Sequence, residues 1–256
     1  MKQSYKQIAE VAALAGRIML ESQAESYRVE DTVQRILQTS GLATTEVFSN
    51  TTGLFITLDD QHIEPITLIR RIKERGTHLR KIYRVNHISR QLTSGTISLE
   101  EAHQQLIAVD EAEYTVLHRD LSIFMLVISF ALLLGGSWGD IVLSGVAAII
   151  VIIAGWGKTY FGLNPIIAGT FTTTLLGLIM PLILHSLAKD YSLDILIVSA
   201  LMPLFPGTAF TNGIRDSLKG DYVSGVAKLI EALVIASSLA IGIAFGLFLS
   251  NGVMGI

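Results

Sequence analysis

Hydrophobic residues change their spacing along the first part of this chain. In residues 5–39 they recur every three or four positions, which predicts two amphipathic helices, with Gly41 placed to end the second. Residues 45–69 are rich in Val, Phe, Ile, Thr and Leu, and the turn cluster Asp59-Asp60-Gln61 separates two alternating runs. This pattern is typical of a small antiparallel sheet.

Helical spacing returns after the expected sheet. Apolar residues between Leu79 and Leu92 predict a further helix that ends near Gly95. Ser98 and Glu101 then have the spacing of a capping box, in which each side chain accepts a hydrogen bond from a backbone N–H at a helix start. We expect the helix that begins there to run toward Asp120. These elements predict an α+β domain in residues 1–118.

Residues 119–256 contain long apolar segments. A helix needs about 17 to 25 mainly apolar residues to cross a bilayer, and five segments qualify: 121–138, 141–157, 165–188, 193–210 and 229–250. We expect a tight hairpin at Gly139-Asp140, unless the first two segments form one re-entrant hairpin, and a longer connection over 211–228. The predicted fold is a membrane all-α bundle of five transmembrane helices, preceded by a small cytoplasmic α+β domain.

Charge is distributed very unevenly and supports a membrane location. Of the 19 Lys and Arg, 14 lie in residues 1–120, as do 16 of the 22 Asp and Glu, which leaves 11 charges for the rest of the chain. A soluble domain carries charge on about a quarter of its residues. The net charge of −3 gives no reason to expect nucleic acid as a partner.

Lysine and arginine also predict the orientation, because positive residues near span ends stay cytoplasmic. The first residues lack the apolar core of a signal peptide, so we expect the N-terminal domain in the cytoplasm and the C-terminus outside. The cytoplasmic side would then hold Arg119, Lys158, Arg215, Lys219 and Lys228, and the outer side Lys189.

Metal and cofactor sites are not expected. The chain has no Cys, and the His residues of the first domain include no pair four apart on a helix. A basic run between Arg70 and Arg84 is interleaved with Glu74, which favours a solvated face or contact with anionic lipid head groups over nucleic-acid binding.

Prolines interrupt the fourth apolar segment. Pro203 and Pro206-Gly207 follow about nine apolar residues, and proline removes a backbone donor. Broken helices at membrane depth occur where they line a cavity, often a transporter's substrate site, although a kink in a packing helix is the alternative. We therefore predict a substrate-binding group of five residues: Pro206, Gly207, Asn212, Arg215 and Asp216.

Chemistry around this group suits a small zwitterionic or anionic solute. Arg215 can donate to a carboxylate, and Asn212 can donate and accept. Glu231 is the acid placed well inside a predicted span, so it is a proton-coupling candidate together with Asp216. Alternatively, Lys228 pairs with Glu231 on one helix face.

Two small-residue features mark the spans. Gly242 and Gly246 have a spacing that permits close helix approach. Thr170 and residues 172–174 form a hydroxyl patch that could line a pathway, but bonds to their own helix backbone are the favoured interpretation.

Three stretches of the chain resemble the signatures of the threonine/serine exporter (ThrE) family. They are residues 15–31, residues 79–90, and residues 203–207 with 212–216 and 220–225. The N-terminal stretches contribute five motif residues: Glu25, Arg28, Glu30, Arg80 and Asn86. Gln23 stands where the family usually has Gly, which weakens the expectation of a tight backbone approach there.

The resemblance implies a subunit of a secondary transporter in a bacterial cytoplasmic membrane. Full-length family members look like two membrane halves in one chain, so this chain resembles the large, YjjP-like subunit of the split form. The resemblance then implies a small all-membrane YjjB-like partner subunit, an oligomeric complex and proton-driven export of threonine, serine or a dicarboxylate such as succinate.

Two alternatives stay open. One is a membrane-anchored hydrolase-like enzyme with Glu25, Glu30 or His78 as acid–base groups, although no nucleophile motif or phosphate loop supports it. The other is a membrane scaffold or sensor without transport activity. The preferred prediction is that the protein is not an enzyme.

Overall fold

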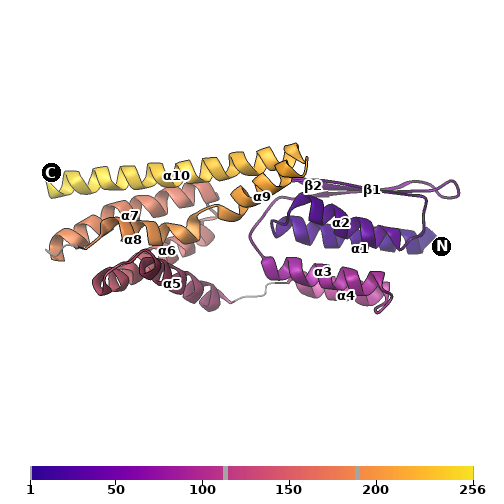
Figure 1. Ribbon diagram of the computed structural model, residues 1–256, viewed down its shortest axis with the longest axis horizontal. Helices are drawn as coiled ribbons and strands as arrows, with labels where there is room; N and C mark the ends of the chain where they lie inside the picture. The colour runs from indigo at the N-terminus through magenta and orange to yellow at the C-terminus, as the bar shows by residue number, and fades with distance from the viewer. Residues whose placement is uncertain (1, 112–114, 188–190, 256) are drawn as a thin grey trace. The chain divides into compact units, whose positions relative to one another are not determined.

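A computed structural model describes residues 2–111, 115–187 and 191–255 (Figure 1). The chain forms two compact units, and residues 207–230 belong to the first of them with residues 1–113. The second, helical unit contains residues 114–206 and 231–256. The predicted domain boundary after residue 118 stays a prediction.

Helices flank a three-stranded antiparallel sheet in the N-terminal unit, which confirms the α+β prediction. Leu54, Ile56 and Leu58 of the central strand are buried against the helices. The opposite face of the sheet exposes Phe48 and Phe55. The elements are α1 (Lys2–Glu21), α2 (Ser26–Gln38), β1 (Thr44–Asn50), β2 (Gly53–Asp59), β3 (Ile66–Arg71), α3 (Leu79–Thr93) and α4 (Leu99–Asp110).

The sheet contains one strand more than the two runs predicted from the sequence. An additional turn at Thr51-Thr52 splits the first run, and the Asn50 side chain accepts a hydrogen bond from the Thr52 N–H at 2.8 Å. This local bond competes with a continuous strand, which is why the alternation alone did not reveal the turn.

The capping box at the start of α4 is confirmed. The Ser98 N–H donates to Glu101 at 2.7 Å, and the Glu101 N–H donates to the Ser98 hydroxyl at 3.2 Å. The prediction that this helix runs toward Asp120 is wrong. Helix α4 ends at Asp110, Glu111 is extended, and a separate helix begins after Thr115, whose hydroxyl caps it by accepting from the His118 N–H.

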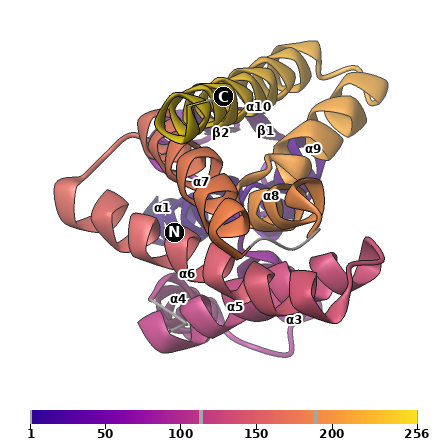
Figure 2. The same ribbon diagram turned by 90° about the vertical axis from the view of Figure 1, so that its left-hand side faces the viewer.

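Long apolar helices form the second unit (Figure 2). Among the described residues, four helices are long and apolar enough to cross a membrane, and a bent helix pair would make a fifth. Val127, Leu176, Met180 and Leu196 lie in the core of this unit. The elements are α5 (Val116–Leu133), α6 (Trp138–Phe161), α7 (Pro165–Leu187), α8 (Leu193–Leu201), the 3-10 turn η1 (Met202–Leu204) and most of α10 (Tyr222–Met254).

The hairpin between the first two spans lies earlier than predicted. Gly135 adopts a left-handed conformation (φ +79°) that ends α5, and Ser137 forms a capping box with Asp140 at the start of α6. Gly139 and Asp140 therefore lie in the first turn of α6, and the predicted turn at these two residues is wrong. Because α5 and α6 are each long enough to span, one re-entrant hairpin is not needed.

The fourth apolar segment is interrupted where the prolines predicted. Helix α8 passes into η1 at Pro203, and α9 (Gly207–Leu218) begins after Pro206. The predicted connection over 211–228 is wrong, because α9 and the first turns of α10 cover most of it. Gly220 makes the turn between them with φ +89°.

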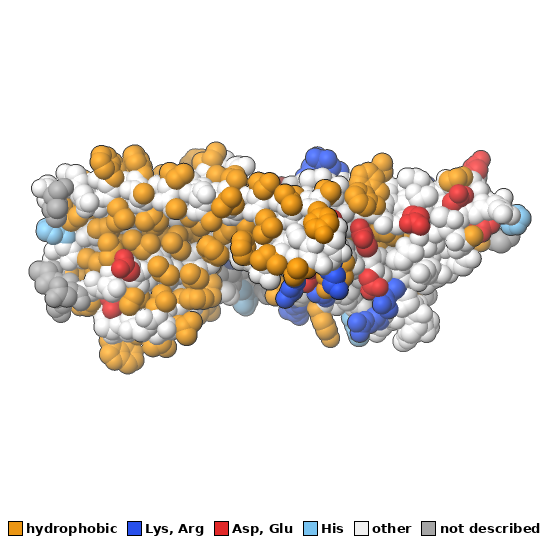
Figure 3. All heavy atoms as spheres, turned by 45° about the horizontal axis from the view of Figure 1, so that its top comes forward, with side chains coloured by type: hydrophobic (Ala, Val, Ile, Leu, Met, Phe, Trp, Pro, Cys, Tyr) orange, Lys and Arg blue, Asp and Glu red, His pale blue; other side chains and the backbone are white. Residues whose placement is uncertain are grey.

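Small residues let α7 and α10 approach each other closely, as the spacing of Gly242 and Gly246 predicted. A Cβ built on Gly246 would lie 2.9 Å from the Cα of Gly177. The hydroxyls of Thr172 and Thr174 donate to carbonyls of their own helix at 2.7 and 2.8 Å, so this patch satisfies itself locally. Figure 3 shows hydrophobic side chains covering much of the visible surface of the helical unit, which suits contact with lipid.

Candidate solute-binding cavity

Helix α1 ends at a residue with a left-handed backbone conformation, directly before the residues of the site. The Ala24 N–H donates to the Met19 carbonyl and the Gln23 N–H to the Leu20 carbonyl, each at 3.0 Å, which is a Schellman ending of α1. Gln23 has φ +63°. Glycine adopts this conformation without strain. The left-handed end of α1 is therefore a sufficient reason for the glycine that the family usually has at the position of Gln23.

Helix α9 contacts the segment between α1 and α2 through consecutive polar pairs. The Asn212 side-chain amide donates to the Gln23 carbonyl at 2.8 Å, and Arg215 forms an ion pair with Glu25 at 2.8 Å. The backbone N–H and hydroxyl of Ser26 donate to Asp216 at 3.1 and 3.2 Å. The N-terminal signature and the signature after the proline break therefore meet in one place.

A buried lysine completes this contact. Lys228 of α10 donates to Asp216 at 2.6 Å and to the Ala24 carbonyl at 3.2 Å, and both charged side chains are almost fully buried. Asp216 thus accepts from three donors, which stabilise its negative charge. Lys228 thus pairs with Asp216 within the N-terminal unit, a partner that the sequence analysis did not consider when it gave Glu231 as an alternative.

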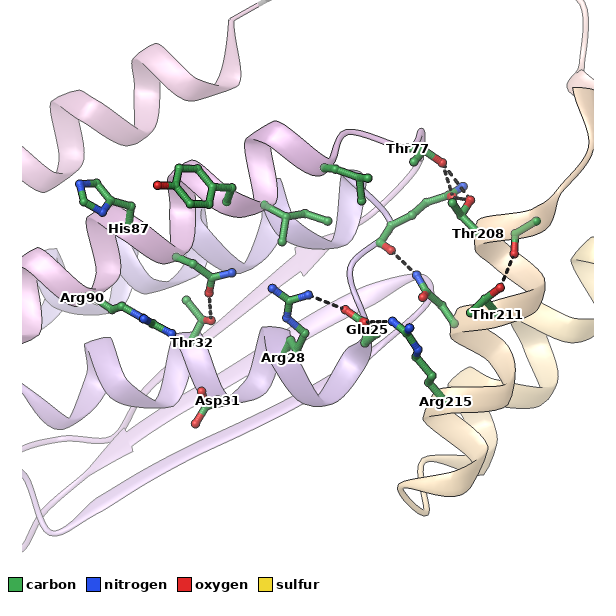
Figure 4. Close-up of a pocket in the computed structure, with 17 residues that line it drawn as sticks. Glu25, Arg28, Asp31, Thr32, Thr77, His87, Arg90, Thr208, Thr211 and Arg215 are labelled. Atoms are coloured by element: carbon green, nitrogen blue, oxygen red, sulfur yellow. Dashed lines mark hydrogen bonds and ion pairs between the residues drawn. The ribbon is translucent and has the colours of Figure 1, made fainter. Parts of the chain in front are cut away.

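A cavity of about 740 Å³ opens beside these contacts (Figure 4). All of its lining residues belong to the N-terminal unit. Six predicted residues line it: Glu25, Arg28, Asn86, Gly207, Asn212 and Arg215. Its volume lies within the range of small-molecule sites, about 300 to 1,000 Å³.

Glu25 lies between two arginines in this cavity. Its carboxylate accepts from Arg28 at 3.1 Å and from Arg215 at 2.8 Å. Burial acts to raise the pKa of Glu25, but a backbone hydrogen bond and the two guanidinium groups outweigh it, so the pKa lies below its usual value. The cavity thus presents an ionised carboxylate and two cations close together.

Other lining residues were not predicted from the sequence. Arg90 and His87 come from α3, and Thr208 and Thr211 come from α9. The helical spacing of Tyr83, His87 and Arg90 was a signal that could have revealed the α3 face. With Asp31, the lining contains three arginines and two carboxylates, so positively charged side chains outnumber negatively charged ones.

Four further predicted residues lie elsewhere in the structure. Glu30 accepts from the Ser49 N–H at 2.8 Å and does not line the cavity. Burial raises the pKa of Glu30, and repulsion from Asp221 and Asp216 raises it further. The hydrogen bonds from Ser49 act to lower this pKa but do not outweigh burial. Arg80 is exposed on α3, and Pro206 and Glu231 belong to the helical unit.

A second cavity, of about 690 Å³, contains part of the basic run. Arg71 and Lys73 line it, while Arg17 in the same wall is paired with Asp110 at 2.6 Å. Within the described parts of the chain, no three His, Asp or Glu side chains form a group that could hold a metal ion.

Comparisons with known proteins support the family resemblance. The family model described as "Putative threonine/serine exporter" matches residues 10–250. A "Threonine/serine exporter" of Corynebacterium glutamicum is 24% identical and aligns with 95% of this chain and 51% of its own length. A "Probable threonine/serine exporter" of Mycobacterium tuberculosis is 20% identical, with 94% of this chain and 46% of its own length aligned.

A shorter relative is similar over most of its length. "Probable succinate transporter subunit YjjP" of Klebsiella aerogenes is 23% identical, with 88% of this chain and 87% of that protein aligned. The chain spans about half the length of the two threonine/serine exporters. No solved structure matches the chain.

Proposed function

The chain belongs to the threonine/serine exporter (ThrE) family of multi-pass membrane transporters, and we propose that it is the solute-binding subunit of a secondary exporter for small hydrophilic metabolites. The observation that carries the proposal is the cavity in which Glu25 and Arg28 of one family signature meet Asn212 and Arg215 of another. The solute would bind there before it crosses the membrane.

Charges in the cavity support a carboxylate-bearing solute. An incoming carboxylate competes with Glu25 for Arg28 and Arg215, because guanidinium groups bind carboxylates with two parallel hydrogen bonds. A zwitterionic amino acid can place its ammonium on Glu25 and a hydroxyl on Asn212. A dicarboxylate can instead use Arg90 for its second charge. Threonine, serine and succinate are therefore the solutes to compare.

Export also needs a partner and an energy source. One relative is named as a transporter subunit, which supports a second, smaller membrane subunit in an oligomeric complex. We place the N-terminal unit in the bacterial cytoplasm. Proton coupling is assigned to Glu231, since an ionisable group in a membrane span commonly serves transport. Asp216, the other candidate, would have to release Lys228 to carry a proton.

Efflux from cells tests the proposal. The chain is expressed with its small partner in cells that lack other exporters, and efflux of labelled threonine, serine and succinate is followed. Arg215→Ala should reduce efflux of the transported solute at least about tenfold, the size expected for a lost charge-assisted pair. Arg70→Ala, which replaces a half-buried arginine of the same unit outside the cavity, is the control and should leave efflux unchanged.

Coupling is tested in the same cells. Glu231→Gln should abolish the dependence of efflux on the proton gradient, since the amide cannot exchange a proton. Unchanged efflux in both Arg215→Ala and Glu231→Gln would refute the site assignment. Absence of efflux for every solute would favour the scaffold or hydrolase alternatives.

A further inference from the structure

Helix α9 has three distinct faces. Ala209, Gly213 and Asp216 are buried on one face, and the cavity is lined by a second that carries Thr208 and Asn212. The third face is apolar and is exposed in the part of the chain that the structure describes. Phe210, Ile214 and Leu218 recur there every four residues and are 52%, 42% and 81% exposed.

The first turns of α10 continue this exposed apolar surface. Tyr222, Val226 and Ile230 are each exposed by about half or more and share one face at four-residue spacing. Leu233 extends the same face beyond the N-terminal unit into the helical unit. The surface is therefore continuous along one helix with the side of a candidate membrane span.

Helix length leaves these turns free to lie at the edge of the bilayer. Residues 231–254 of α10, at 1.5 Å per residue, give about 36 Å. The hydrocarbon core is about 30 Å thick, so this part of the helix, which begins at Glu231, is long enough to cross it without the first turns. Since α9 precedes α10 by one short turn and follows the apolar α8, chain connectivity keeps α9 near the same boundary.

Close packing holds α9 against the start of α10. A Cβ built on Gly213 would lie 2.8 Å from Leu229 and 3.0 Å from the Gly225 carbonyl oxygen. The two helices thus form a hairpin, and each of them carries a row of exposed apolar side chains. Lys219, in the turn between them, is exposed and places its ammonium 5.5 Å from the Tyr27 ring centroid.

We propose that this hairpin is an interfacial membrane anchor. Phe210, Ile214 and Leu218 of α9 and Tyr222 and Val226 of α10 enter the boundary between head groups and acyl chains, and α9 lies along the membrane surface. An amphipathic helix with an apolar face and a neighbouring lysine fits a bilayer containing anionic lipids. This inference does not depend on which solute is exported.

Site-directed fluorescence in nanodiscs tests the anchor. The chain contains no native Cys, so a single cysteine can be labelled with an environment-sensitive fluorophore in the full-length protein. Ile214→Cys and Leu218→Cys report on the anchor. Ile107→Cys is the matched control, because Ile107 and Ile214 are both 42% exposed in the same unit. The nanodiscs contain phosphatidylcholine and phosphatidylglycerol, with lipids that carry a doxyl quencher at a chosen depth.

Quenching at both anchor positions should be about threefold stronger than at position 107 when the doxyl group lies close to the head groups, as expected for interfacial burial. Iodide in the aqueous phase should show the reverse order. Stronger quenching by a doxyl group at the end of the acyl chain would overturn the proposal, because α9 would then cross the membrane. Protection from both quenchers would also overturn it, because a protein would cover the surface instead of lipid.

Discussion

Replacing either member of the buried ion pair in the N-terminal unit should destabilise that unit strongly. The Asp216 and Lys228 side chains are 0% and 6% exposed and lie 2.6 Å apart. In Asp216→Asn, Lys228 keeps the Ala24 carbonyl and can donate to the amide oxygen, but it loses its counter-charge. In Lys228→Met, Asp216 keeps the two donors of Ser26 but loses its counter-charge.

The expected loss follows from burial. Leaving an uncompensated charge in a buried site costs about 3 to 5 kcal/mol of unfolding free energy. The double variant Asp216→Asn/Lys228→Met leaves no isolated charge, so it should be less destabilised than the two single losses added together. We expect a coupling energy of about 2 kcal/mol or more, as found for contacting groups.

Hydrogen exchange in mild detergent measures the effect in the full-length chain. Exchange of peptides that cover α2 and α9 gives the free energy of local opening. The Ser26 N–H is a direct reporter, since it donates to Asp216. Asp31→Asn and Arg35→Met are the matched controls, because this ion pair at 2.9 Å has side chains 59% and 58% exposed. Exposed pairs contribute about 0.2 to 1 kcal/mol.

Two results would refute the reasoning. In one, the single substitutions at the buried pair cost no more than those at the exposed pair, so burial adds nothing. In the other, the double variant loses the full sum of the single losses, so Asp216 and Lys228 do not interact energetically.

Four further predictions concern single positions. Gln23→Gly should be more stable than Gln23→Ala by about 1 kcal/mol in thermal unfolding, because only glycine adopts a left-handed backbone without strain; equal stability would contradict this. Glu25→Gln should be less stable than the parent at neutral pH and lose this deficit below pH 4.5, because the folded state lowers the Glu25 pKa from 4.5. Glu30→Gln should gain stability over the parent as pH rises above 4.5, because the folded state raises the Glu30 pKa. Melting temperatures measured across pH test the Glu25 and Glu30 predictions. Variant and parent profiles that run parallel would refute them. Gly225→Ala should separate α9 from α10 and lower the melting temperature, whereas Gly157→Ala, with open space around it, should not; equal effects would refute close packing.

Local patterns predicted the elements that depend on nearby residues. The capping box of Ser98 and Glu101 and the break at Pro203 involve only neighbours along the chain, and the structure contains both. Local signals also explain the errors. Alternation did not reveal the turn at Thr51-Thr52, and a mixed polar and apolar stretch concealed α9, whose polar side chains face partners distant in sequence.

The candidate site shows where sequence reasoning ends. Motif residues such as Glu25 and Arg215 could be selected individually, because they are charged residues in stretches that resemble the family signatures. Their meeting could not be predicted, because a 190-residue separation carries no periodicity. Thr211 was missed for the same reason, whereas the helical spacing of Arg90 with Tyr83 and His87 was a local signal for the α3 face.

Apolar length and the scarcity of charge were enough to determine that the C-terminal half is a membrane bundle, because the bilayer requires long uncharged helices whatever they pack against. Only the tertiary structure assigned α9 and the start of α10 to the N-terminal unit and paired Lys228 with Asp216. The physical reason is that a buried charge takes the partner that folding brings within hydrogen-bond reach, and sequence spacing offers only the partners on the same helix.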